Sequence, residues 1–365
     1  MNCNYADQGL YIGSTPSGET QIAMCCWQQK QVISDPVSMH HPHLIQLRNL
    51  DMPAQCSPYC SEPGHVANER ERCQNDPWWS TGVKIKKLHL EQSLICNLAC
   101  ISCSTLYSSR WNQWYREFDP GADLIELKQQ PESVWQHLDL SEVEHIHFTG
   151  GEPLLNPDNV KILQHLDSID QLENVAVSYC TNGTVVPDDR LLALWSKAKW
   201  VRLFVSLDGV GSTFEYTRWP ADWKTVSENI SRFRKITGPC ILIEVDAIVG
   251  IHNLWNMNDF YSWWQDNCRT GNQGDPSQVF VRSIEPSSYG GRVLSLQNLP
   301  SELADSARST ILSLESLPGA RDLSKNISTT PSTEWIQYLD RLDQQRSGNW
   351  RASLQGPITT VGSNI

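Results

Sequence analysis

The sequence predicts an α/β fold in which a partial (βα)6 barrel of the TIM type carries a small, cysteine-rich N-terminal module and a helical C-terminal extension. From about residue 83, short β-rich runs alternate with helical stretches, as in parallel βαβ units. The first 80 residues are rich in Cys, Pro, Gln and His with little periodicity, and from residue 299 the chain is helical and polar. We therefore expect three domains, at residues 1–80, 81–298 and 299–365.

The barrel is predicted from six strands and the helices between them. The strand candidates are residues 83–90, 145–148, 175–180, 201–207, 241–249 and 279–284, and the helix candidates include 104–118, 159–168, 188–197 and 223–236. We expect the chemistry at the carboxyl ends of these strands, because that is where such barrels place their active sites. The basic run Lys84, Lys86 and Lys87 lies in the first strand and is expected to form a solvated edge.

The N-terminal module contains one predicted hairpin. Two short strand-like stretches, 11–12 and 21–23, flank the turn-forming sequence Thr-Pro-Ser-Gly at 15–18, which is typical of two strands joined by a turn. The C-terminal extension contains Ser-rich breaks and Pro331. We expect it to be either a covering helix pair or a partly disordered tail.

The composition is that of an acidic globular protein, with 39 % hydrophobic and 19 % charged residues. The net charge of −12 disfavours a general nucleic-acid-binding surface, which needs a basic stripe. No apolar run approaches the roughly 20 residues that span a bilayer. Residues 1–10 lack the basic start and apolar stretch of a secretory signal. We expect a cytoplasmic protein without a membrane partner.

Twelve cysteines indicate metal binding or catalysis, because disulfides are rare in the cytoplasm. Cys96, Cys100 and Cys103 form a C-x3-C-x2-C pattern directly after the first strand candidate. Three such thiolates can bind three irons of one [4Fe–4S] cluster, and the fourth iron then stays open for a small molecule. The alternatives are a zinc site or cysteines without function. Structural zinc normally has four protein ligands, whereas this motif supplies three cysteines.

A second motif makes the sequence resemble the radical S-adenosylmethionine (SAM) superfamily. Gly150, Gly151, Glu152 and Pro153 follow the second strand candidate and resemble the family's GGEP motif. The resemblance implies that the backbone at the two glycines approaches the amino group of the methionine part of SAM. The alternative is a simple turn before a helix. The position of the motif, one βα unit after the cysteines, favours the family.

Two further strand ends extend the resemblance, which covers about residues 83–290. Thr181 and Asn182 end the third strand candidate, and Ser206 and Asp208 end the fourth. Both segments look like the family's contacts to the ribose and the methionine carboxylate of SAM. Small polar residues suit that task because they form hydrogen bonds without filling a cleft. The segment at His252, after the fifth strand, resembles the one that meets the adenine and ribose side.

The N-terminal cysteines are similar to those of a twitch module, a reduced form of the SPASM domain that carries an auxiliary iron–sulfur cluster. The candidate ligands are Cys3, Cys25, Cys26, Cys56 and Cys60. Here the module precedes the barrel, and the spacing from Gly18 to Cys25 is two residues longer than the usual Gly-x4-Cys. The choice between Cys25 and Cys26 is therefore open. A zinc knuckle on the same cysteines is the alternative.

The resemblance implies an enzyme that cleaves SAM reductively at a [4Fe–4S] cluster, with a reductase such as flavodoxin or ferredoxin as electron donor. The resulting 5′-deoxyadenosyl radical would abstract hydrogen from a substrate. A peptide is the first expectation for that substrate, and a small metabolite or nucleotide-linked sugar is the alternative. Fifteen tryptophans leave another possibility, a non-catalytic iron–sulfur or zinc protein that binds a partner through a Trp-rich surface. The sequence identifies no catalytic residue for the substrate step.

Overall fold

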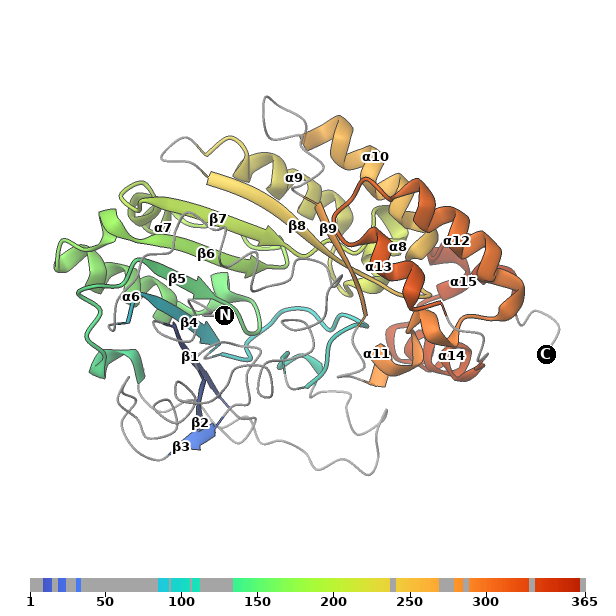
Figure 1. Cartoon of the computed structure of the whole chain (residues 1–365), viewed down its shortest axis with the longest axis horizontal. Helices are drawn as coiled ribbons and strands as arrows, with labels where there is room; N and C mark the ends of the chain where they lie inside the picture. The colour runs from blue at the N-terminus through green and yellow to red at the C-terminus, as the bar shows by residue number, and fades with distance from the viewer. Residues whose placement is uncertain are drawn as a thin grey trace.

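Figure 1 shows the computed structural model of the chain. The structure describes residues 9–14, 19–23, 31–33, 85–91, 93–105, 107–111, 134–236, 241–268, 279–284, 289–327 and 332–361. All structural statements below concern these residues.

A mostly parallel sheet forms the centre of the described part of the chain. Its strand order is β3 (Gln31–Ile33), β2 (Thr20–Ala23), β1 (Gly9–Ser14), β4 (Lys87–Glu91), β5 (His145–Phe148), β6 (Ala176–Thr181), β7 (Trp200–Val205), β8 (Ile241–Val249) and β9 (Val279–Ser283). Strands β4 to β9 run parallel in chain order, and all six predicted strands are confirmed. The closure of this sheet into a partial barrel stays a prediction.

The N-terminal hairpin is confirmed and belongs to the same sheet. Strand β1 pairs antiparallel with β2, and its other edge pairs parallel with β4. Leu10 and Ile12 of β1 are buried, so this strand contributes to the main hydrophobic core. The domain boundary at residue 80 stays a prediction, but residues 9–14 are joined to the larger sheet by hydrogen bonds.

The sheet has one apolar and one polar face, because successive side chains of a strand point to opposite sides. Leu88, Ile146, Val177 and Val201 are buried and share one register row on the apolar face. The neighbouring row is polar. It consists of Tyr11, His89, His147, Ser178 and Arg202, which we call the polar row.

Helices follow the strands, and three of them begin at side-chain caps. The helical elements before the last strand are η3 (Val134–His137), η4 (Pro153–Leu155), α6 (Pro157–Ser168), η5 (Leu172–Asn174), α7 (Asp189–Trp195), α8 (Gly211–Thr217), α9 (Trp223–Phe233), η6 (Leu254–Asn256) and α10 (Met257–Cys268). Asn156, Asp188 and Asp222 cap α6, α7 and α9, since these residues satisfy the free N–H groups of a first turn. Trp195 of α7 donates to the Tyr179 hydroxyl at 3.2 Å, which places α7 on the apolar face.

The described residues after β9 form short helices, more than the pair that was one of the two expectations, and their role as a separate extension stays a prediction. The elements are α11 (Tyr289–Val293), η9 (Leu296–Asn298), η10 (Ser301–Leu303), α12 (Ala304–Ser313), α13 (Ala320–Lys325), α14 (Glu334–Arg346), α15 (Trp350–Ser353) and η11 (Pro357–Thr360). These helices gather on one side of the molecule, beside α8 and α10 (Figure 1). Trp335, Leu339 and Trp350 are fully buried and belong to the main core.

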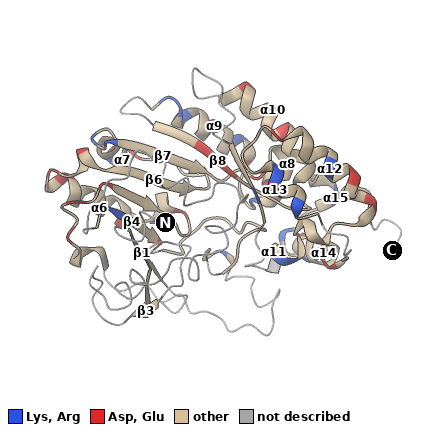
Figure 2. Cartoon of the chain, viewed as in Figure 1, with Lys and Arg blue, Asp and Glu red and all other residues tan. Residues whose placement is uncertain are grey.

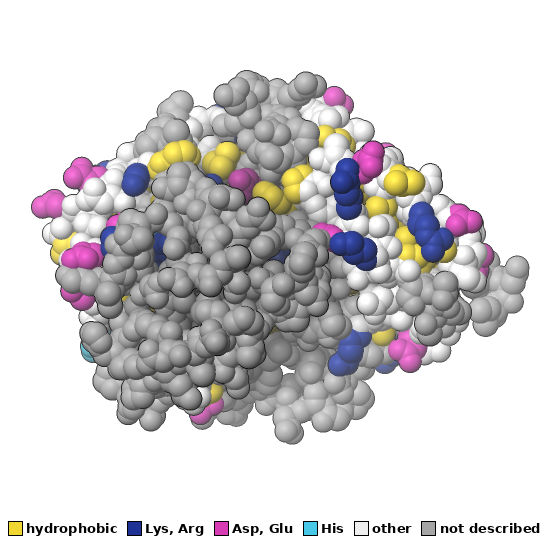
Figure 3. Space-filling model, in the orientation of Figure 1, with side chains coloured by type: hydrophobic (Ala, Val, Ile, Leu, Met, Phe, Trp, Pro, Cys, Tyr) yellow, Lys and Arg dark blue, Asp and Glu magenta, His cyan; other side chains and the backbone are white. Residues whose placement is uncertain are grey.

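Charges of both signs are spread over the described surface. Glu244 and Asp246 make β8 acidic (Figure 2). Arg282 of β9 pairs with Asp246. In the view of Figure 3, basic and acidic side chains alternate over the C-terminal helices and form no basic stripe there. Within the described ranges, every helix is too short or too polar to span a membrane.

Candidate active site

The three clustered cysteines lie on a loop, residues 93–103, which we call the cysteine loop. It follows β4 and is held at the carboxyl edge of the sheet by backbone hydrogen bonds. The amides of Ala99 and Ile101 donate to the carbonyls of Trp219 and Thr217 at 2.8 and 2.9 Å. The amide of Glu152 donates to the Ile95 carbonyl at 2.8 Å. These contacts join the loop to segments that follow β5 and α8.

The segment after the cysteine loop folds back on it. The helix predicted at residues 104–118 is wrong for residues 104–105 and 107–110, which form turns and irregular backbone. The Ser108 hydroxyl donates to the Leu98 carbonyl at 2.6 Å, and the Trp111 indole donates to the Cys100 carbonyl at 2.9 Å. Such contacts between side chain and backbone compete with helix formation. Residues 112–118 lie outside the described part of the chain.

The thiols of Cys96, Cys100 and Cys103 are free and close enough to influence one another. Burial raises the pKa of Cys96, and it raises the pKa of Cys100 to about 11. Burial and then the two neighbouring sulfurs raise the pKa of Cys103. The three sulfurs therefore need bound cations to become thiolates together.

The two glycines of the GGEP motif lie against the cysteine loop. Gly150 and Gly151 have φ of +80° and +53°, which favours glycine. A Cβ on Gly151 would lie 2.3 Å from the Ile95 carbonyl oxygen, and one on Gly150 would lie 2.9 Å from the Ser93 carbonyl oxygen. Glycine is therefore required at these two positions because two backbone segments cross closely there, which the sequence alone did not reveal.

Glu152 links the ends of β5 and β6. It is buried, and its carboxylate accepts from the Thr181 hydroxyl at 2.9 Å, from the Asn182 amide at 2.7 Å and from the Leu154 amide at 3.0 Å. Burial raises its pKa to about 7, while these hydrogen bonds oppose the rise. Pro153 follows as the first residue of η4. Glu152 therefore ties together two segments that the sequence predicted separately.

Asn182 brings the end of β6 to the cysteine loop. Its side-chain amide donates to the Asn97 oxygen at 2.9 Å and to the Cys96 sulfur at 3.9 Å. The backbone amide of Leu98 also donates to the Cys96 sulfur, at 3.5 Å. Hydrogen bonds to the charged form of a group favour that form. Asn182 and Leu98 thus surround Cys96 with donors suited to a thiolate.

Asp208 and Arg218 form a buried ion pair behind the loop. The Asp208 Oδ2 lies 2.7 Å from the Arg218 Nε, with side-chain exposures of 0 and 9 %. The Ile248 amide donates to the Asp208 Oδ1 at 2.9 Å. Arg218 also donates to the Cys100 sulfur at 3.7 Å. Ser206 is joined to the same edge by its backbone amide, which donates to the Thr181 carbonyl at 2.9 Å.

The end of β8 adds His252 and Asn253. Asn253 donates to the carbonyls of Asp208 and Ile248 at 2.9 and 2.8 Å, so it fixes the strand ends. His252 is fully buried, and no described residue forms a hydrogen bond with its ring nitrogens. Burial, and then the charge of Arg218, lowers the pKa of His252 to about 3. The ring is therefore neutral at ordinary pH.

The polar row lies across the sheet and leads to Cys180. The rings of His89 and His147 meet edge to face at 4.8 Å. The Nδ1 of His147 lies 2.7 Å from the Ser178 hydroxyl, and its Nε2 lies 3.5 Å from the Cys180 sulfur. Lys87, on the same face, is buried, so the prediction of a solvated edge was wrong for it. The polar face therefore carries titratable groups within its strands, and Cys180 places a thiol near the carboxyl end of β6.

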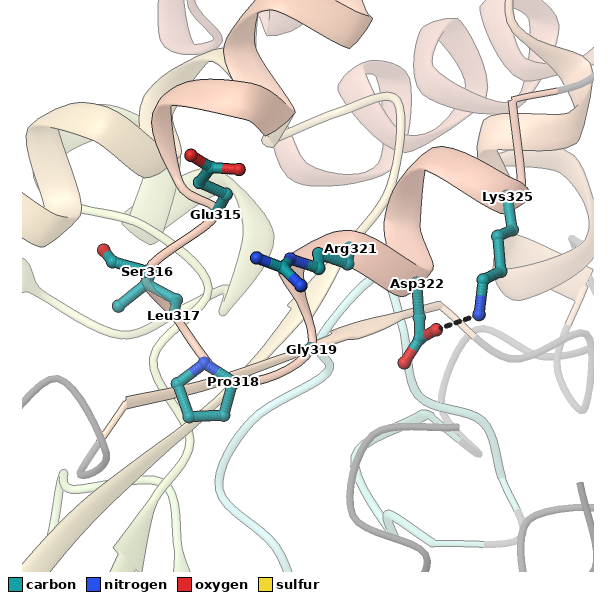
Figure 4. Close-up of a pocket in the computed structure, with 8 residues that line it drawn as sticks. All are labelled: Glu315, Ser316, Leu317, Pro318, Gly319, Arg321, Asp322 and Lys325. Atoms are coloured by element: carbon teal, nitrogen blue, oxygen red, sulfur yellow. Dashed lines mark hydrogen bonds and ion pairs between the residues drawn. The ribbon is translucent and has the colours of Figure 1, made fainter. Parts of the chain in front are cut away.

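Some expected features lie elsewhere. Cys3, Cys25, Cys26, Cys56 and Cys60 lie outside the described residues, so the auxiliary cluster stays a prediction. Within the described part, no three His, Cys, Asp or Glu side chains form a group that could hold one metal ion. A pocket of about 500 Å³ is lined by residues of the 315–325 segment (Figure 4). None of the residues that meet around the cysteine loop lines it.

Comparison with known proteins places this site in a family. Residues 91–261 match the model of the radical SAM superfamily. Residues 91–261 thus form a radical SAM domain, and the chain is an enzyme. One curated relative, the GTP 3′,8-cyclase of Clostridium acetobutylicum, is 26 % identical over 240 residues, which are 65 % of this chain and 68 % of the relative.

Solved structures are similar at low identity. Histidine-tagged anSMEcpe with bound AdoMet has 17 % identity and a TM-score of 0.42, over 63 % of this chain and 56 % of that chain. Streptococcus suis SuiB bound to S-adenosylmethionine has 13 % identity and a TM-score of 0.39, over 72 % of this chain and 49 % of SuiB. The chain thus spans about half the length of these two structures. SuiB has also been solved bound to its precursor peptide SuiA.

The family implies SAM and a [4Fe–4S] cluster, and the residues at the cysteine loop fit such a cluster. In a cluster of this kind each protein thiolate binds a different iron, and the cysteine loop supplies three neighbouring thiols. The side chains of Asn182 and Arg218 donate to two of the sulfurs. The sequence missed Arg218, because no local motif marks a residue that reaches the loop from 118 positions away.

Proposed function

We propose that Cys96, Cys100 and Cys103 hold a [4Fe–4S] cluster whose fourth iron binds SAM. The observation that carries this is the convergence of one buried and two half-buried thiols with hydrogen-bond donors from Asn182 and Arg218 at the carboxyl edge of a parallel sheet. When bound, these cofactors would supply one-electron cleavage of SAM to methionine and a 5′-deoxyadenosyl radical that abstracts hydrogen from a substrate.

The protein's part is to place and shield these groups. Gly150 and Gly151 let the segment after β5 cross the cysteine loop closely, which supports a SAM-binding edge formed by Gly150, Gly151, Glu152 and Pro153. Glu152 fixes the Thr181 hydroxyl and the Asn182 amide by hydrogen bonds. We assign the ribose and carboxylate side of SAM to the ends of β6 and β7, at Thr181, Asn182, Ser206 and Asp208.

Arg218 balances the charge that the site collects. Three thiolates on a cluster bring negative charge into a buried place, which is costly without a counter-charge. Arg218 lies between Asp208 and the Cys100 sulfur, so its one guanidinium offsets the negative charge of both groups. A reductase such as flavodoxin or ferredoxin would provide the electron, and we propose a cytoplasmic location for this reaction.

The substrate is proposed to be a peptide that meets the polar face of the sheet. The polar row and Cys180, which lies two residues before Asn182 on the chain, offer hydrogen-bonding side chains, and such side chains suit the amide groups of a peptide. A small metabolite is the second candidate, favoured by the relative whose name specifies GTP as its substrate. Anaerobic assays with 5′-deoxyadenosine as the readout would show which class of compound stimulates SAM cleavage.

An assay of cluster binding tests whether Cys96, Cys100 and Cys103 hold the cluster. Anaerobic reconstitution with iron and sulfide should give the absorption and, after reduction, the electron paramagnetic resonance signal of a [4Fe–4S] cluster. Changing Cys96, Cys100 and Cys103 together to Ala should lower the iron content by about four atoms. Changing Cys268, a buried thiol on α10, to Ala is the matched control and should change nothing. Equal iron in the parent and the triple variant would overturn the assignment.

A further inference from the structure

The last turn of α14 reaches the cysteine loop from the far end of the chain. Arg346 ends this helix and is 8 % exposed. One of its terminal nitrogens donates to the Ala99 carbonyl at 2.5 Å, and the other donates to the Tyr216 carbonyl at 3.2 Å. A guanidinium is planar and carries several donors in a fixed fork. Arg346 thereby fixes the position of the loop relative to α8.

Aromatic rings hold this guanidinium in place. It lies 5.7 Å from the centre of the Trp111 ring and 5.4 Å from that of Trp219. Both rings belong to segments that contact the cysteine loop, since Trp111 donates to the Cys100 carbonyl and Trp219 accepts from the Ala99 amide. Contacts between a cation and an aromatic face are stronger when both are removed from water.

A second contact from the same helix holds the other side of Cys100. The Tyr338 hydroxyl donates to the Ile101 carbonyl at 3.3 Å. Gly290 of α11 lies close to the same carbonyl, since a Cβ there would be 2.2 Å from its oxygen. The C-terminal helices therefore hold the loop at Ala99 and at Ile101, the two residues that flank Cys100.

We propose that Arg346 is a positioning residue of the cluster site: it holds the backbone of the cysteine loop through Ala99, and its buried positive charge stabilises the reduced cluster. The C-terminal segment is then part of the site and not merely its cover. This inference rests on the proposed function, because it requires a cluster on the loop. Buried charges act strongly, since little water screens them, and reduction adds a negative charge nearby.

Three variants separate position from charge. Arg346→Lys keeps the charge and loses the fork, Arg346→Met loses both, and Tyr338→Phe loses one hydroxyl and no charge. Arg308→Met is the matched control, because Arg308 is an exposed arginine on α12 that pairs with Asp305. Each full-length protein is reconstituted anaerobically with iron and sulfide. The measurements are the rate of iron loss to a chelator and the midpoint potential of the cluster.

We expect both Arg346 variants to lose iron about tenfold faster than the parent, the size of effect typical for residues that support metal ligands. Tyr338→Phe should also lose iron faster. The midpoint potential should fall in Arg346→Met and stay near that of the parent in Arg346→Lys and Tyr338→Phe. If Arg346→Met does not fold, the other two variants still test the positioning through their iron loss.

Unchanged iron loss and potential in every Arg346 and Tyr338 variant, with a normal cluster in the parent, would overturn this inference alone. A parent that takes up no iron–sulfur cluster would overturn the proposed function and this inference with it. An equal potential shift in Arg346→Met and Arg308→Met would contradict the local charge effect.

Discussion

At the scale of single residues, the site depends on buried polar groups that satisfy one another. Asp208 and Arg218 are nearly excluded from water and face each other at 2.7 Å. Glu152 accepts three hydrogen bonds in the interior. Such groups contribute little net stability when intact but cost much when one partner is removed. Their value here is the fixed geometry that they give to the strand ends.

The Asp208–Arg218 pair gives a prediction about stability. Arg218→Met leaves the Asp208 carboxylate buried without its counter-charge, and the free energy of unfolding should fall by about 3 kcal/mol or more. Adding Asp208→Asn to this variant should recover part of the loss, because no unpaired charge then remains. Chemical denaturation of the parent, the two single variants and the double variant measures the coupling. A double variant as unstable as the sum of the two single ones would contradict the coupling.

His252 gives a prediction about pH. Its pKa is lowered in the folded protein to about 3, while an unfolded histidine titrates near 6.5. Between these values the unfolded chain binds the extra proton, so this histidine makes the folded state less stable as the pH falls below about 6.5. His252→Gln should therefore lose less stability on acidification than the parent. His137→Gln, at an exposed position on η3, serves as the control and should follow the parent curve.

At the scale of elements, the chain's secondary structure was predictable where local pattern decides it. Strands at 145–148 and 241–249 were predicted with their observed bounds, because apolar residues mark them. The turns at 107–110 were not predictable, since they follow from contacts to Leu98 and Cys100. Lys87 was misjudged because a short basic run looks solvated until its face of the sheet is known.

The crossing of two loops at Gly151 gives a further prediction. Gly151→Ala would place a Cβ 2.3 Å from the Ile95 carbonyl oxygen, so the cysteine loop must shift and cluster retention should fall. Gly211→Ala is the control, because Gly211 has nearly the same φ, +57°, and open space around its Cβ position. It should cost only about 1 kcal/mol of backbone strain and keep its iron. The measurement is the iron content of both variants after reconstitution. Equal iron contents would contradict the claim that the cluster requires the close approach of Gly151 to the cysteine loop.

At the scale of the whole molecule, the site is assembled from distant parts of the chain. Cys100 contacts Arg218, and Ala99 contacts Arg346, 247 positions away. The motif cysteines and GGEP could be found from the sequence because their spacing is local. The two arginines could not, because their roles depend on how α8 and α14 pack against the loop. The pairing of β1 with β4 escaped prediction for the same reason.

The N-terminal cysteines give a prediction at this scale. We expect Cys56→Ala with Cys60→Ala to lower the iron content by about four atoms while the cluster at the cysteine loop remains. The 1–80 segment should also become easier to proteolyse, because metal binding often contributes folding energy to small modules. Near-stoichiometric zinc in anaerobically purified protein would favour the zinc knuckle. Unchanged iron in the double variant would mean that these two cysteines hold no cluster.

The most direct test of the account is the formation of 5′-deoxyadenosine and methionine from SAM by the reconstituted, reduced protein under anaerobic conditions. We expect both products from the parent, and none above background when Cys96, Cys100 and Cys103 are changed together to Ala. The Cys268→Ala control should retain the activity of the parent. SAM cleavage by the triple variant at the parent's rate would contradict the central claim that the cysteine loop holds the catalytic cluster.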